Sequence, residues 1–127
     1  MRKILVAAGA VLQLLLPDGV VWSQATQDTG SSELVRQCRL AQSDAKTMTN
    51  IKDLSDASQC IRYIEGFVAG ASLVQNTKPF CVPNTTRIID EVNSYVTWMD
   101  KNKEILNQPK QVTLLRALRE SYPCRNN

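Results

Sequence analysis

Four cysteines are the residues of this 127-residue chain that are best suited to covalent chemistry, and no histidine accompanies them. Without an imidazole, the chain cannot form a Ser-His-Asp or Cys-His catalytic set. No two cysteines form a close Cys-x-x-Cys pair of the kind used for redox exchange or zinc binding. An even number of cysteines in an exported protein usually forms disulfides. We therefore expect two disulfides, formed by Cys38, Cys60, Cys81 and Cys124. We expect no metal and no cofactor.

Paired carboxylates are the remaining candidates for catalysis. Asp90 or Glu91 could act together with Asp100 in the manner of glycosidases. All three residues fall in a segment with helical periodicity, where exposed charges are ordinary. The favoured interpretation is therefore a solvated helix surface, and we expect a protein that binds rather than an enzyme.

The first 25 residues are typical of a secretion signal. Arg2 and Lys3 give a positively charged start, residues 4–16 are apolar, and residues 23–25 (Ser-Gln-Ala) offer a cleavage site. The apolar run is shorter than the roughly 20 residues that span a bilayer, and no second apolar stretch supports the alternative of a retained membrane helix. We expect cleavage after Ala25 and no membrane attachment afterwards.

The remaining residues have the composition of one small domain with a protein partner. Residues 26–32 lack an apolar anchor and are predicted to be disordered, and residues 33–127 are predicted to form the domain. Loss of the signal leaves a net charge of about +2. The basic residues are scattered and are not interleaved with aromatic ones, which argues against nucleic-acid binding.

Apolar residues recur at helical spacing in four segments, and no segment alternates as a strand would. The sequence therefore predicts an all-α fold, a small disulfide-stapled bundle of four main helices. Ser32 is expected to cap the first helix, and Asn84 or Thr85 the third. The expected helices cover residues 32–41, 55–75, 84–99 and 109–122, with a long polar connection at 43–56 that could hold one short helical turn.

Gly66 and Gly70 lie one turn apart inside the second predicted helix. Each glycine costs roughly 1 kcal/mol relative to alanine in a helix interior. Close approach of another helix would explain the missing side chains. A membrane-type dimer motif is the weaker alternative, because Arg62 and Glu65 interrupt the segment.

Helix order limits the disulfide pairing, which cysteine spacing alone leaves open among three connectivities. Antiparallel neighbours bring the end of the first helix beside the start of the second, which predicts Cys38–Cys60. The same reasoning places the end of the fourth helix near the start of the third, which predicts Cys81–Cys124. A Cys60–Cys81 bridge would have to span most of the second helix, roughly 25 Å, whereas bridged α-carbons lie within about 7 Å.

Three motifs together resemble the Rap/Tai family of type VI secretion immunity proteins. They are CIRYIEGFVAG at residues 60–70, FCVP at 80–83 and LLRALRESYPC at 114–124, and with Cys38 the resemblance covers roughly residues 34–124. It implies a small periplasmic helical protein, often a homodimer. Its partner would be a secreted peptidoglycan amidase, which it would bind and occlude.

Two polar loops are the predicted contact surface for such a partner, because a rigid bundle can present them with little ordering cost. The residues are Asn76, Lys78, Lys101, Asn102, Lys103 and Asn107. Two other functions fit a small disulfide-bonded helical protein. One is a periplasmic acid-stress chaperone, which would expose apolar surface on acidification, and the other is a subunit of an envelope complex.

Overall fold

The computed structural model describes residues 30–74 and 76–125. The predicted signal peptide, its cleavage site and residues 26–29 lie outside the described residues. The all-α prediction is confirmed, with four helices and two short 3-10 turns in the described chain. Their bounds are α1 (Ser31–Ala41), η1 (Ala45–Thr47), α2 (Ile51–Ser72), α3 (Ile88–Lys101), η2 (Lys103–Ile105) and α4 (Lys110–Ser121).

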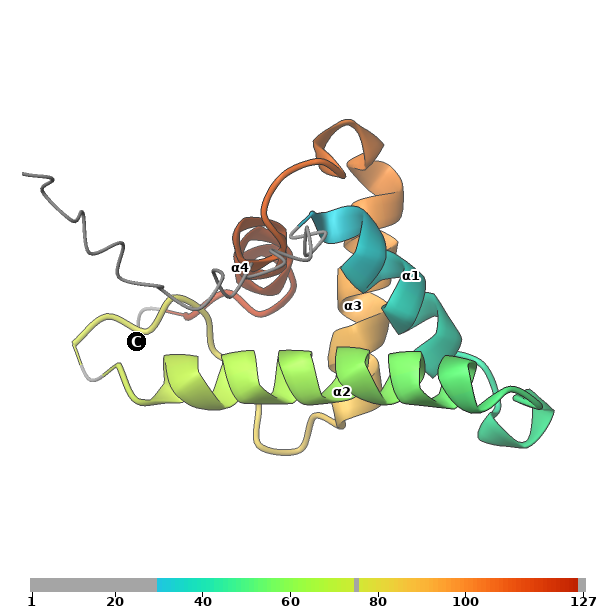
Figure 1. Ribbon diagram of the computed structural model, residues 1–127. Helices are drawn as coiled ribbons and strands as arrows, with labels where there is room; N and C mark the ends of the chain where they lie inside the picture. The colour runs from blue at the N-terminus through green and yellow to red at the C-terminus, as the bar shows by residue number, and fades with distance from the viewer. Residues whose placement is uncertain (1–29, 75, 126–127) are drawn as a thin grey trace, which may run out of the picture.

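The helices pack around one core (Figure 1). α2 is the longest helix and lies along one side of the molecule, while α1 and α3 pack against it and α4 is seen nearly end-on. Apolar residues three and four apart in each helix fall on one face, which is why these faces are buried together. The buried core consists of Leu34, Val35, Cys38, Cys60, Ile64, Phe80, Val92, Tyr95, Val96, Trp98, Met99, Leu114, Ala117 and Leu118.

Both predicted disulfides are confirmed. Cys38 in α1 is bonded to Cys60 in α2, with the α-carbons 5.1 Å apart. Cys81, after α2, is bonded to Cys124, after α4, with the α-carbons 4.9 Å apart. The first bond is fully buried in the core, whereas Cys81 is exposed at the surface.

Helix α1 begins earlier than expected. Gly30 precedes its first turn and pairs with Pro109 in an isolated β-bridge, so Ser32 is not the cap. Ser31 is completely buried, and its backbone N–H donates to the carbonyl of Gln108 at 3.0 Å. The predicted disordered segment 26–32 is therefore too long at its C-terminal end, because buried hydrogen bonds hold its last residues in place.

Helix α2 also begins earlier, at Ile51 and not at 55, so the expected long connection at 43–56 was wrong. The Asn50 side chain accepts a hydrogen bond from the Lys52 backbone N–H at 2.8 Å and caps the helix. Apolar spacing did not predict this turn, because its apolar residues do not continue the buried stripe of the helix. Ile51 is 85% exposed and Leu54 is 50% exposed. The helix ends at Ser72.

Helix α3 begins later than expected, at Ile88, so neither Asn84 nor Thr85 caps it. The Asp90 carboxylate accepts hydrogen bonds from the backbone N–H and the guanidinium of Arg87 instead, which satisfies the open first turn. In α4, Val112 is partly exposed.

Gly66 and Gly70 do not mark a close helix contact. A Cβ atom added at either glycine would meet nothing within 4 Å, so the expectation of tight packing was wrong. Both glycines are exposed, as are Ala69 and Leu73 on the same side of α2. These four exposed residues, three of which are glycine or alanine, are what we call the smooth face of α2.

Candidate partner-binding surface

The loop after α2 carries the first two predicted contact residues. Asn76 and Lys78 are both exposed. Downstream of them, the Cys81 backbone N–H donates to the Tyr122 carbonyl at 2.8 Å, and the Cys81–Cys124 bond fixes the same point. This loop, residues 76–82, is therefore held against the end of α4 at Cys81, and its polar residues are exposed.

Two exposed apolar side chains lie immediately before this loop. Leu73 is 78% exposed and Val74 is 45% exposed at the end of α2. Val74 lies beyond the end of α2, although the sequence predicted that the helix would continue to residue 75. Apolar side chains beside polar ones are typical of protein interfaces.

The end of α3 and its connection to α4 carry the other four predicted residues. Lys101, Lys103 and Asn107 are exposed, whereas Asn102 is half-buried. The Asn102 amide donates to the Trp98 carbonyl at 2.8 Å and so closes the end of α3. Asn102 is therefore already engaged in holding the helix end.

This connection is anchored to the start of α1. The Ser32 backbone N–H donates to the Leu106 carbonyl at 3.1 Å, beside the Ser31–Gln108 bond already described. Residues 103–109 thus form a held loop whose side chains Lys103 and Asn107 project outward.

The structure does not bring the two predicted loops together. The 76–82 loop lies at the end of α2, and the 101–109 connection lies at the far end of α3, with α4 between them (Figure 1). A partner protein of ordinary size could contact one of these loops with adjoining helix surface, but the two do not form a single continuous patch.

A groove of about 440 Å³ between α3 and α4 joins two of the predicted residues to others that sequence reasoning missed. At its floor, Trp98 donates from Nε1 to a Glu120 carboxylate oxygen at 2.6 Å. The sequence feature that could have indicated this groove is a stripe of polar residues on α3 at three- and four-residue spacing. The groove is lined by Asn93, Ser94, Thr97, Trp98, Lys101, Asn102, Glu120 and Ser121.

The carboxylates considered for catalysis do not form a pair. Asp90 is engaged by Arg87, and Asp100 is bonded to Arg39 from α1. Along the axis of α3, Asp100 lies about 13 Å from Glu91, farther than the roughly 9.5 Å that separates the carboxyl groups of inverting glycosidases. Among residues 30–74 and 76–125, no group of three or more acidic or cysteine side chains could hold a metal ion.

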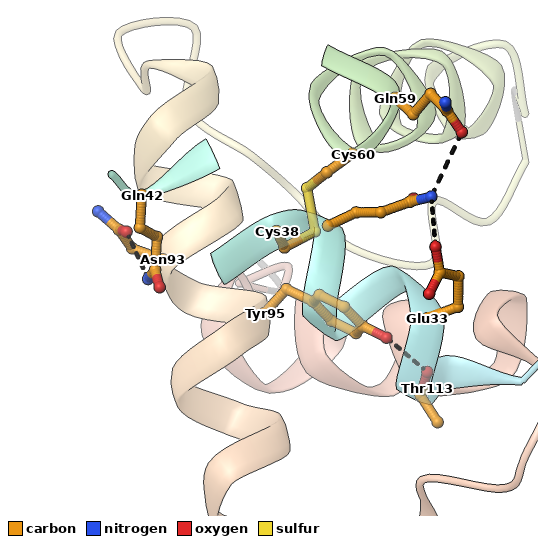
Figure 2. Close-up of a disulfide and its surroundings, with 9 residues drawn as sticks. Glu33, Cys38, Gln42, Gln59, Cys60, Asn93, Tyr95 and Thr113 are labelled. Carbon is orange, nitrogen blue, oxygen red and sulfur yellow. Dashed lines mark hydrogen bonds between the residues drawn. A yellow bond between two sulfur atoms is a disulfide. The ribbon is translucent and has the colours of Figure 1, made fainter. Parts of the chain in front are cut away.

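An ion-pair network holds α1 against α2 beside the buried disulfide. The buried Asp56 carboxylate accepts from Lys52 and from Arg36, each at 2.6 Å, and these bonds lower its pKa. Gln37 links Glu33 to Gln59 across the same helix pair, as Figure 2 shows next to the Cys38–Cys60 bond. The packing of α1 on α2 is thus fixed by covalent, ionic and apolar contacts together.

The fold and surface define a small helical protein with two disulfides, held loops and a polar groove, suited to contact with another protein. The family model for Rap1a immunity proteins matches residues 30–124, and the chain belongs to this family. Its members are typically non-enzymatic and usually periplasmic, and their role implies binding a secreted effector. Comparisons with curated proteins and with solved structures found no match. No helix in the described part of the chain is long and apolar enough to cross a membrane.

Proposed function

We propose that this protein is a periplasmic immunity protein that binds a type VI secreted peptidoglycan amidase and blocks its active site. The observation that carries the proposal is the family match over residues 30–124, which covers nearly the whole described chain. The N-terminal residues typical of a secretion signal, and the two disulfides, suit an oxidising compartment outside the cytoplasm.

The proposed mechanism is occlusion by a preformed surface. Both predicted loops are anchored by backbone hydrogen bonds, and one is also fixed by a disulfide. A surface that is ordered before binding loses less conformational entropy on association, so more of the contact energy appears as affinity. Lys101, which lines the α3–α4 groove, and the exposed Lys103 would add electrostatic attraction to an acidic partner surface.

The direct test uses a purified type VI secreted peptidoglycan amidase as the candidate effector. The purified immunity protein should bind it in calorimetry and inhibit its cleavage of peptidoglycan in proportion to complex formed. Absence of both binding and inhibition, with a folded protein whose disulfides are intact, would reject the amidase as the target.

Two double variants locate the contact surface. Lys101→Ala/Lys103→Ala and Asn76→Ala/Lys78→Ala remove the polar side chains of one loop each, and Lys46→Ala in η1 is a matched control on an exposed turn. We expect one double variant to weaken effector binding at least about tenfold, the loss typical of truncating interface anchors, while the control binds as the parent does. If neither double variant loses affinity, these loops are not the contact surface.

We also propose a homodimer that uses the smooth face of α2. Its four exposed residues leave room for a second helix to approach closely, and Leu73 adds apolar area at one end. Sedimentation equilibrium should show a dimer for the parent protein and a monomer for Gly70→Arg. A monomeric parent, or a dimer that survives this substitution, would contradict the proposal.

A further inference from the structure

A second pocket, separate from the α3–α4 groove, lies between α2 and the start of α3. Its volume is about 380 Å³. Its walls combine apolar side chains with two carboxylates, one from each helix. The residues that matter to the argument are Val68, Val82 and Ile88 on the apolar side and Glu65 and Glu91 on the acidic side.

Glu91 is the unusual residue of this pocket. Glu91 is only 6% exposed, and its Oε2 atom is buried without a hydrogen-bond partner. Burial raises the pKa of Glu91, and the neighbouring carboxylates of Glu65 and Asp90 raise it further. A buried carboxylate without a partner is costly to the folded state, so such a group needs an explanation.

Several other carboxylates in the described chain have cationic partners. Asp56 is held by Lys52 and Arg36, and Asp100 by Arg39. Asp90, next to Glu91 in sequence, is held by Arg87. Glu91 forms no ion pair within residues 30–74 and 76–125, and the charged groups around it, Glu65 and Asp90, are both negative. The described residues therefore supply no cationic partner for Glu91.

We propose that the pocket formed by Glu65 and Glu91 binds a lysine side chain of a partner protein. The apolar stem of a lysine would lie against Val68, Val82 and Ile88, and its ammonium group would reach Glu91 at the inner end and Glu65 at the rim. The last torsion of a glutamate side chain is soft, so Oε2 can turn toward an incoming donor without moving α3. A compact ammonium fits two carboxylates on different helices better than a planar guanidinium, which requires its acceptors in one plane.

The identity of the partner as the secreted effector rests on the proposed function, whereas the chemistry of the pocket does not. A lysine on the effector surface that enters this pocket would be desolvated together with Glu91. Such a charge-assisted contact, made at the centre of an interface, contributes more to affinity than one at the exposed rim.

The first experiment tests the pocket alone. Nuclear magnetic resonance titration of the full folded chain uses N-acetyl-lysine methylamide as the probe and the uncharged N-acetyl-norleucine methylamide as its matched control. We expect the lysine probe to shift the amide signals of Val68 and Ile88 saturably, to lower the pKa of Glu91, and to bind at least about tenfold more tightly than the norleucine probe. Equal shifts from both probes, or none from the lysine probe, would overturn the proposal.

Three variants assign the effect to the carboxylates. Glu91→Gln and Glu65→Gln should each weaken lysine-probe binding, the first at least about tenfold, and exposed Glu104→Gln in η2 should leave it unchanged. If Glu91→Gln fails to fold, Glu65→Gln, which changes an exposed residue, decides the outcome. Parent-like binding by a folded Glu91→Gln protein would overturn the assignment.

A second measurement separates this inference from the proposed function. If the lysine probe binds but the secreted amidase does not, the lysine site is supported and the amidase is rejected as the target. If the amidase binds with equal affinity to the parent and to Glu91→Gln, the amidase is supported as the effector, but the effector does not bind through this pocket.

Discussion

Buried hydroxyl groups give the interior of this protein a specific polar contact that an apolar pattern cannot reveal. Ser31, Tyr95 and Thr113 come from three helices and meet in the core. The Ser31 and Thr113 oxygens lie 2.6 Å apart, and the Tyr95 and Thr113 oxygens 3.1 Å apart (Figure 2 shows the second contact). Because three helices share it, this cluster fixes the position of α1 relative to α3 and α4.

Thr113→Val keeps the shape of the side chain but removes its hydroxyl. Tyr95, which is completely buried, then loses its hydrogen bond to Thr113, and this should lower the free energy of unfolding by about 1 to 3 kcal/mol. Urea denaturation measures the loss. Thr97→Val, at an exposed position on α3, is the matched control and should change stability little. Equal stability of the two variants would mean that the cluster does not contribute.

Asp56 links stability to pH. Its pKa is lowered in the folded protein by hydrogen bonds from Lys52 and then Arg36, so its contribution is fully present above the ordinary carboxyl pKa. The contribution is lost as the pH falls through the lower, folded-state value. Asp56→Asn should therefore reduce the melting temperature at neutral pH, and its difference from the parent should disappear in acid.

Asp53→Asn, one turn earlier on the same helix, is the control for this effect. Thermal melts of all three proteins across the acidic range give the comparison. A deficit of Asp56→Asn that persists unchanged in strong acid would show that packing, and not ionisation, causes it.

At the scale of single residues, the sequence predicted the cysteine chemistry but not the buried polar groups. The cysteines could be paired because helix order restricts which α-carbons can meet. Ser31 was assigned to a disordered tail, since a serine beside glycine and other polar residues carries no local signal of burial. Its partners lie 77 and 82 residues away in the chain, and only the folded structure brings them together.

At the scale of elements, the two disulfides differ in their access to solvent. Cys38–Cys60 is sealed in the core between α1 and α2, whereas Cys81–Cys124 joins two chain segments at the surface. Disulfides are reduced by attack of a thiolate on a sulfur atom, so access controls the rate.

Mild reduction of the native protein should open Cys81–Cys124 first. Trapping free thiols with iodoacetamide, followed by peptide mass mapping, should label Cys81 and Cys124 while Cys38 and Cys60 stay unlabelled until the protein unfolds. A urea-unfolded sample treated in the same way serves as the control and should label all four. Early labelling of Cys38 in the native state would contradict the exposure seen here.

Helix ends were predicted less well than helix cores, and α2 shows why. Its first turn has two exposed apolar residues, so burial does not select it. The Asn50 cap and the ion pairs of Asp56 help to hold it in place. Capping is a short-range polar signal that many turns share. The central turns of α2 and α3 were predicted because their apolar residues keep helical spacing over several turns.

At the scale of the whole molecule, the covalent bond at the surface stabilises the fold as well as the loop. Cys81→Ala/Cys124→Ala removes a link between residues 43 positions apart. In the chain-entropy model, this should cost about 3 to 4 kcal/mol, and it should also free the 76–82 loop. Equilibrium unfolding under non-reducing conditions measures the cost, with the parent protein, which keeps both disulfides, as the reference. A loss well under 1 kcal/mol would show that the unfolded chain gains little freedom from the change.

The fold of the described residues was predicted from the sequence almost in full, whereas the contact surface was not. Loop residues such as Asn76 and Asn107 were chosen because they are polar, and the structure confirms only that they are exposed. The groove around Trp98 and the pocket around Glu91 arise where two helices meet side by side. Such concave sites depend on helix crossing, which residue spacing within one helix does not determine.

Trp98 gives this protein its own optical signal for contact at the α3–α4 groove. The chain has two tryptophans, and the other, Trp22, would be removed with a signal cleaved after Ala25. The remaining indole donates to Glu120 in a groove that also contains Lys101. Fluorescence of the processed protein would therefore report from one place only, and a spectral change upon mixing with an effector that lacks tryptophan would indicate that the groove is occupied, without any attached dye.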